Sequence, residues 1–146
     1  MKISVVILTK NEAEMIEDCL NSLTELKPTE ILIIDDDSTD ATAKIAREKG
    51  ARVLEYRKKD FADARNYASR EVNGDWILYI DADERVSEDL AAEIKNKSSE
   101  SLSDAYKIKR VNFYLGKRWP HVEEIVRLIK KSALRGWKGE VHESPE

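Results

Sequence analysis

Residues 74–84 read Gly-Asp-Trp-Ile-Leu-Tyr-Ile-Asp-Ala-Asp-Glu, an apolar run that ends in acidic residues. Its central residues, 76–80, are all apolar or aromatic, which is typical of a strand that is buried on both faces. The strand runs directly into Asp81 and Asp83. In open α/β sheets ligands bind beyond the carboxyl ends of the strands, so these acids stand where a ligand is expected.

The same strand-then-helix pattern occurs four times in the first hundred residues. Strands are expected at residues 3–8, 30–34, 52–55 and 76–80. Helices are expected after each of them, with Asn11 and Glu14 as a capping box for the first and Ser87 as the cap of the fourth. Right-handed crossovers between such units give a mostly parallel sheet flanked by helices.

The pattern changes beyond residue 97. Residues 97–104 are polar and serine-rich, which predicts a loop. Residues 105–115 and 125–137 then read as two strands with no helix between them, which predicts antiparallel additions to the sheet. A length of 146 residues fits one domain, with residues 1–100 as its first part and 101–146 as its second.

Composition excludes several classes of protein. No apolar run approaches the roughly 18 residues of a membrane-spanning helix, and the N-terminus has no signal-peptide cleavage site. The lone Cys19 falls on the apolar stripe of the first predicted helix, so we expect it in the core of a protein of the reducing cytosol. The net charge of −4 argues against a nucleic-acid binder.

Charge is distributed unevenly along the chain. Residues 1–100 carry 15 basic and 23 acidic side chains, whereas residues 101–146 carry 10 and 6. The basic segment is expected either to face an anionic acceptor or a membrane surface, or to be a solvated face.

Two acidic clusters follow strands of the predicted sheet, at residues 35–37 and 81–84. Two carboxylates about 4 Å apart repel each other by roughly 4 kcal/mol at an effective dielectric near 20. A divalent cation such as Mg²⁺ relieves this repulsion, and the spacing of Asp81 and Asp83 in an extended segment would aim both at one ligand. Alternatively, the acids only cap the following turn and helix.

Four segments, taken together, resemble family 2 glycosyltransferases, which have the nucleotide-sugar-binding GT-A fold. They are residues 4–12 (SVVILTKNE), 34–42 (IDDDSTDAT), 64–68 (ARNYA) and 74–84 (GDWILYIDADE). A weaker resemblance, to the branch that includes bacterial lipopolysaccharide-core glucosyltransferases, lies in residues 106–116, 127–131 and 139–143. Members of that branch are usually longer, which implies a short acceptor side here.

The resemblance implies a role for each matching residue. The nucleotide-binding set is Thr9, Asn11, Glu12, Asp35, Asp37, Arg65, Asp81 and Ala82. Within that set Asp35 would bind the base, and Asp37 stands where the family usually has glycine. Asp83 would coordinate Mg²⁺ or Mn²⁺ beside the diphosphate, with His142 as a second ligand.

The implied reaction is inverting transfer of a sugar, most simply from a UDP-sugar, to a cell-envelope glycan or lipid-linked saccharide. Glu143 is the expected base, with Glu124 as the rival, and Asp83 shares the catalytic role through the metal. The expected location is the cytoplasm, with a possible peripheral contact at the inner face of the membrane.

Two other functions remain open. The chain could be a non-catalytic nucleotide-sugar-binding module of the same fold. An acidic pocket at strand ends also occurs in phosphoacceptor signalling domains, so the chain could be one of these instead.

Three further residues have open roles. Trp119 and Trp137 could each stack on a sugar acceptor or close the core, and His121 is expected in a loop.

Overall fold

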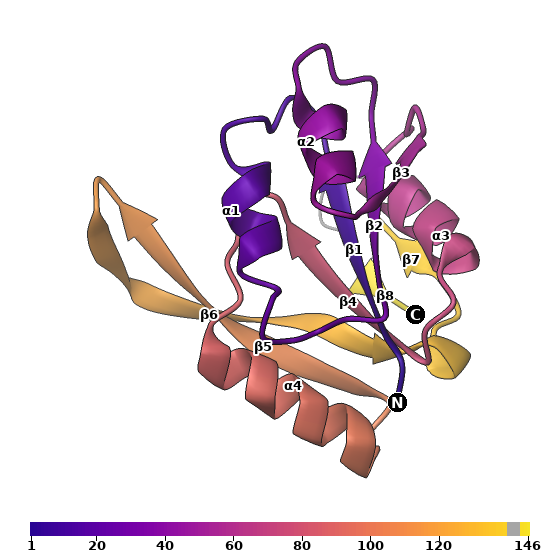
Figure 1. Ribbon diagram of the computed structural model, residues 1–146. Coiled ribbons are helices and arrows are strands. Elements are labelled where there is room, and N and C mark those ends of the chain that lie inside the picture. The colour runs from indigo at the N-terminus through magenta and orange to yellow at the C-terminus, as the bar shows by residue number, and fades with distance from the viewer. Residues whose placement is uncertain (140–143) are drawn as a thin grey trace.

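The computed structural model describes residues 1–139 and 144–146. Within them the main sheet has six strands in the order β3-β2-β1-β4-β6-β5 (Figure 1). Its strands are β1 (Ile3–Thr9), β2 (Glu30–Asp35), β3 (Arg52–Glu55), β4 (Trp76–Asp81), β5 (Ala105–Tyr114) and β6 (Lys117–Lys130). The first four are parallel, while β6 runs antiparallel to both β4 and β5. The predicted α/β class with antiparallel additions near the C-terminus is confirmed.

Helices cover both faces of the sheet, because the central strands are apolar on both sides. They are α1 (Ile16–Asn21), α2 (Thr42–Glu48), α3 (Phe61–Glu71) and α4 (Glu88–Glu100). The chain ends in a 3₁₀ turn, η1 (Lys131–Ala133), and a small sheet of β7 (Trp137–Lys138) and β8 (Ser144–Pro145).

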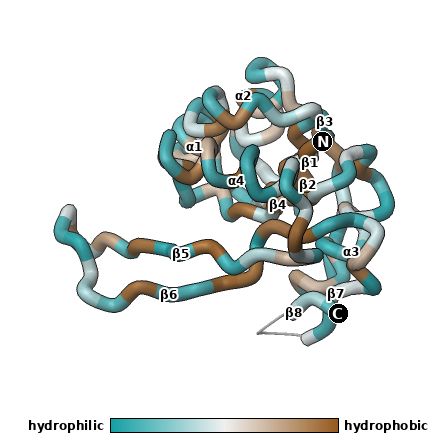
Figure 2. The backbone as a smooth tube through the Cα atoms, turned by 90° about the horizontal axis from the view of Figure 1, so that it is seen from below, coloured by the Kyte–Doolittle hydropathy of each residue, from teal (hydrophilic) through white to brown (hydrophobic). Residues whose placement is uncertain are grey.

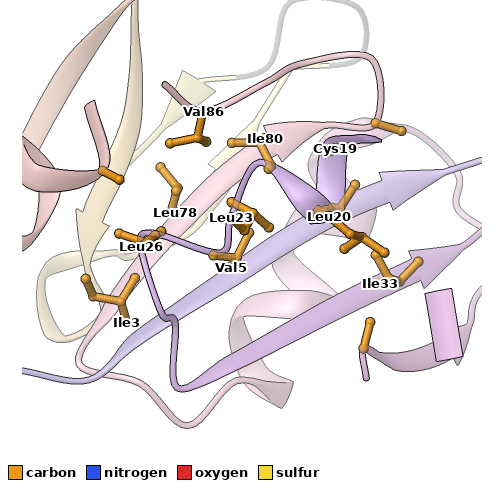
Figure 3. Close-up of a cluster of buried hydrophobic side chains, with 14 of the residues drawn as sticks. Ile3, Val5, Cys19, Leu20, Leu23, Leu26, Ile33, Leu78, Ile80 and Val86 are labelled. Carbon is orange, nitrogen blue, oxygen red and sulfur yellow. The ribbon is translucent and has the colours of Figure 1, made fainter. Parts of the chain in front are cut away.

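The core on one face lies under α1, α2 and α4, and Figure 3 shows part of it. Val5, Ile33 and Leu78 of the sheet pack there against Cys19 and Leu20 of α1. The predicted burial of Cys19 is confirmed, and burial raises the pKa of its thiol to about 12. The core on the other face lies under α3 and includes Trp137.

Strand register brings the carboxyl ends of β1, β2 and β4 together. Thr9 pairs with Asp35 across β1 and β2, and Leu8 pairs with Asp81 across β1 and β4. The loops that follow these three strands therefore share one edge of the sheet.

The capping box predicted for the first helix is wrong. Helix α1 begins at Ile16, and its N-cap, Met15, makes no side-chain capping bond. Asn11 instead adopts a left-handed conformation, and its Oδ1 accepts a 2.8 Å hydrogen bond from the backbone N–H of Thr39. The side chain of Asn11 thus bonds to Thr39, in the loop after β2, and does not cap α1.

The bounds of the C-terminal elements also differ from expectation. Residues 97–100 belong to α4 rather than to a loop, and the side chain of Ser98 is buried. The residue that caps the end of the helix, Ser101, has a left-handed backbone conformation. Strand β6 begins at Lys117 rather than residue 125, and it gives way to η1 well before Trp137. The polar residues 117–124 form a strand because they pair with β5, which their sequence alone does not indicate.

Candidate active site

A cavity of about 660 Å³ lies at the carboxyl ends of β1 and β4. Five residues of the expected site line it, namely Glu12, Arg65, Asp81, Ala82 and Asp83. The base of the β5–β6 hairpin also lines this cavity, and Glu124, the alternative to Glu143 as catalytic base, is among its lining residues. Sequence-distant residues of the predicted site are thus brought together.

Thr9 and Asp35 lie beside this cavity, at the ends of β1 and β2. The Asp35 carboxylate is buried and accepts hydrogen bonds from Thr9 Oγ1 at 2.7 Å and from Ser38 Oγ at 2.6 Å. The backbone N–H of Ser38 donates a third, at 3.0 Å. The carboxylate therefore holds the loop that follows β2 in place.

Two further residues of the expected nucleotide-binding set adopt left-handed backbone conformations. The φ angle is 52° at Asn11 and 55° at Asp37. Asp37 occupies the position where the resembling family segment has glycine, the residue that adopts this conformation most readily, and aspartate is among the better substitutes. Its exposed carboxylate lies 2.9 Å from Arg57.

Asp81 and Asp83 reach the cavity by a different geometry from the one expected. Asp81 is the last residue of β4, but Asp83 lies in a turn that is closed by a 3.0 Å hydrogen bond from the Glu84 N–H to the Asp81 carbonyl. The argument from alternation in an extended segment is therefore wrong, although both side chains line the same cavity.

An ion-pair network that the sequence did not predict surrounds Asp81. Arg127, on β6, is buried and donates to the Asp81 carboxylate at 3.2 Å and to the Glu84 carboxylate at 3.0 Å. Arg110, on β5, reaches the same Glu84 oxygen at 3.4 Å. Burial raises the pKa of Glu84, and the Arg127 charge opposes that rise. The sequence does contain one indication of this network: Arg127 lies within the apolar run 125–129, where a charged side chain needs a buried partner.

Arg65 projects from α3 into the cavity wall and is buried. Its guanidinium lies 3.7 Å from the Asp81 carboxylate, 4.7 Å from the Trp137 ring centre and 5.8 Å from that of Tyr79. This placement puts a positive charge next to Asp81 in the wall of the cavity.

Negative charge gathers on the Glu12 side of the cavity. Burial raises the pKa of Glu12, and the nearby carboxylates of Asp83, Asp40 and Asp81 raise it further. These neighbouring carboxylates disfavour the charged form of Glu12, so a bound cation would relieve the repulsion.

The donor set fits a divalent metal in part. No group of three acidic, histidine or cysteine side chains able to hold a metal occurs within residues 1–139 and 144–146. In the same residues, the exposed Asp83 carboxylate forms no ion pair or hydrogen bond. Since Mg²⁺ typically takes one or two carboxylates together with phosphate oxygens, Asp83 suits a metal that a substrate diphosphate would complete.

The remaining candidates divide between the cavity, the hairpin and the C-terminal segment. Trp137 lines the cavity and also closes the core, edge-on to Tyr79 with ring centres 4.8 Å apart. Trp119 and His121 are exposed on β6 and do not line the cavity. His142 and Glu143 lie outside the described residues.

Known proteins share both the sequence and the fold. The profile of the family described as Glycosyl transferase family 2 matches residues 4–142. A glycosyltransferase of Rickettsia prowazekii is 35% identical over 124 residues, which cover 83% of this chain and 42% of that protein. The chain spans less than half the length of this relative and of two further curated Rickettsia relatives.

Two solved structures with bound nucleotides are similar to this one. Staphylococcus aureus TarS in complex with UDP-GlcNAc gives a TM-score of 0.68 at 27% identity, covering 83% of this chain and 37% of that chain. Mycobacterium tuberculosis glucosyl-3-phosphoglycerate synthase, with Mn²⁺, UDP and glucosyl-3-phosphoglycerate, gives 0.51 at 28% identity, covering 56% and 33%.

The arrangement of the sheet agrees with the GT-A fold of these structures. No helix in the described part of the chain is long and apolar enough to span a membrane. The family profile covers nearly all of the sequence, including every strand of the main sheet and the acidic turn after β4. The chain belongs to glycosyl transferase family 2.

Proposed function

We propose that this chain forms the donor-binding part of an enzyme that transfers a sugar from a nucleoside diphosphate to an acceptor hydroxyl. One observation carries the proposal: the open carboxylate of Asp83 shares a cavity with the guanidinium groups of Arg65 and Arg127. A diphosphate with its divalent cation needs both kinds of charge. UDP is the favoured nucleotide, because the complexes of TarS and glucosyl-3-phosphoglycerate synthase contain it.

Each side of the site has its own task. Asp83, with His142, would hold Mg²⁺ or Mn²⁺, which supplies Lewis-acid stabilisation of the departing diphosphate. The loop after β1, which carries Asn11, and the loop after β2, which Asp35 holds in place, would enclose the nucleoside. Arg65 would orient Asp81 toward the ribose, since the two side chains are 3.7 Å apart.

The transfer we propose inverts the sugar carbon, so a carboxylate must take the acceptor proton on the face away from the diphosphate. Glu124 is supported by its place on the hairpin, in the lining of the same cavity as Asp83. Glu143 is the other candidate. Glu143→Gln and Glu124→Gln decide between them: the base variant loses transfer but keeps UDP affinity, whereas the other retains transfer.

The acceptor we propose is a cell-envelope glycan or a lipid-linked saccharide, as in the lipopolysaccharide-core branch. Such an acceptor places the protein in the cytoplasm with a peripheral contact at the inner face of the membrane. Residues 1–100 would form the donor part and residues 101–146 the acceptor side of a single domain. The excess of basic residues beyond residue 100 supports this assignment.

Isothermal titration of the full chain with UDP in Mn²⁺ tests the donor site. Asp83→Ala should abolish the metal-dependent part of UDP binding, while Asp89→Ala, an acid on α4, should leave it unchanged. Equal affinity for the wild type and Asp83→Ala would reject the metal role of Asp83.

A donor-hydrolysis assay on the same protein tests catalysis. UDP binding with release of sugar supports the enzyme. UDP binding without turnover, even with candidate acceptors, identifies a nucleotide-sugar-binding module instead. The family match has already set aside a phosphoacceptor signalling domain.

A further inference from the structure

The β5–β6 hairpin leaves the body of the molecule as a long arm (Figures 1 and 2). Only the inner end of β6 pairs with the sheet, through residues 128–130 against β4. The pairing of β5 with β6 continues outward to Tyr114 and Lys117, which flank the turn. Among residues 1–139 and 144–146, the strand pairing of the outer end of the arm is therefore that between β5 and β6.

Large apolar side chains gather at that outer end. The exposed fractions are 68% for Phe113, 66% for Tyr114, 86% for Leu115 and 51% for Trp119. Tyr114 and Trp119 lie edge to face, with ring centres 6.3 Å apart. A cluster of exposed apolar side chains on a soluble surface usually marks an interaction site.

The same end of the arm is basic. Residues 111–121 contain Lys117 and Arg118 and no aspartate or glutamate. The whole hairpin, residues 105–130, carries seven basic and two acidic side chains, a net charge of +5 in a chain whose net charge is −4. The arm is thus a cationic extension of an otherwise acidic protein.

We propose that the tip of this hairpin, residues 111–121, docks on an anionic lipid bilayer. The aromatic rings and Leu115 would enter the headgroup layer, and Lys117 and Arg118 would contact lipid phosphates. The inference rests on the membrane contact within the proposed function and assigns it to a surface. The base of the same hairpin lines the proposed donor cavity, so docking would hold that cavity close to a lipid-linked acceptor.

A bilayer suits this tip better than a protein partner. The apolar side chains are at the narrow end of a two-stranded arm, whereas a stable protein interface needs about 800 Å² of matched surface on each partner. A fluid headgroup layer needs no matched shape. Trp, Tyr and basic residues beside aliphatic ones are also the composition that favours the membrane–water interface.

Cosedimentation of the full chain with lipid vesicles tests the inference. The vesicles are phosphatidylcholine alone and phosphatidylcholine mixed with phosphatidylglycerol. The wild type should bind the anionic vesicles, and added salt should weaken binding because it screens the charges. Lys117→Gln with Arg118→Gln should lower the partition coefficient about 25-fold, from about fivefold per basic residue near an anionic surface.

Phe113→Ser with Leu115→Ser removes the apolar part and should lower partitioning by about tenfold or more. The matched control is Leu102→Ser, another exposed leucine, which lies between α4 and β5 and outside the tip. All of these side chains are exposed, so the variants should keep the circular dichroism spectrum of the wild type.

UDP titration of the same preparations separates this inference from the proposed function. Vesicle binding without UDP binding would reject the donor site and retain the docking tip. UDP binding with no preference for anionic vesicles, or equal vesicle binding by all variants, would reject the docking tip. Tip-dependent self-association in light scattering, without vesicle binding, would show an interface between copies and overturn the inference.

Discussion

Asp36 follows β2 and has a different environment from its neighbour Asp35. Lys58 Nζ lies 2.6 Å from its carboxylate and Lys10 Nζ lies 3.6 Å away. The hydrogen bond from Lys58 lowers the pKa of Asp36 below its ordinary value. A carboxyl group with a lowered folded-state pKa stabilises the fold above its unfolded pKa, and loses that contribution as pH falls through the folded pKa.

Lys58→Met should therefore destabilise the protein at neutral pH but have a diminishing effect in acid. The difference in unfolding free energy between wild type and variant should shrink below about pH 4, the ordinary titration range of aspartate. Urea denaturation across a pH series measures this difference. Lys44→Met, on the exposed face of α2, is the matched control. A constant difference at all pH values would contradict the assigned pairing.

At the residue scale the sequence predicted the acids but not their partners. Asp81 and Asp83 were predicted because they follow an apolar strand, and both line the cavity. The partners of Asp81 come from α3 and β6, and no local pattern encodes those contacts. Asn11 shows the same limit, since Thr39 of a distant loop decides its conformation.

Among the helices, α4 has the N-terminal cap that its sequence predicts. The side chain of Ser87 accepts a 3.1 Å hydrogen bond from the Leu90 N–H, as the sequence predicted. Ser87→Ala should lower the unfolding free energy by about 1 kcal/mol, within the usual range for loss of an N-cap. Ser87→Asp should restore most of it, because aspartate caps equally well. Chemical denaturation of the three proteins measures the effect, and an unchanged Ser87→Ala midpoint would contradict it.

Elements with strong local patterns were predicted well, and those that depend on partners were not. The buried strands β1, β2 and β4 are apolar runs that end in polar residues, so their positions were clear from the sequence. The outer part of β6 is polar and exposed, and it is a strand only because β5 pairs with it. A single sequence contains no periodicity that reports such pairing.

At the scale of the whole molecule, the Arg127 network joins the hairpin to the acidic turn after β4. Arg127 and Arg110 come from β6 and β5, whereas their shared partner Glu84 follows β4. The side chains of Arg127 and Glu84 are only 10% and 20% exposed, so removing one partner leaves a poorly solvated charge. The base of the arm and the proposed donor site are thus one charged unit.

Arg127→Met should lower the unfolding free energy by about 3 kcal/mol, because it leaves the poorly solvated carboxylate of Glu84 without its Arg127 partner. Adding Glu84→Gln should recover part of that loss in unfolding free energy, because the unpaired carboxylate charge of Glu84 is then removed. A double-mutant cycle in urea measures the coupling between the two side chains. Additive effects of the two substitutions would show that the pair contributes nothing of its own.

The bonds that hold the loops after β1 and β2 have a further consequence for binding. Thr9, Ser38 and Asn11 fix these loops through side-chain hydrogen bonds formed within the protein itself. A ligand that enters there meets a preorganised rim, so little loop entropy is lost on association. Because this ordering has already taken place during folding, the proposed nucleotide would lose little affinity to the ordering of these loops.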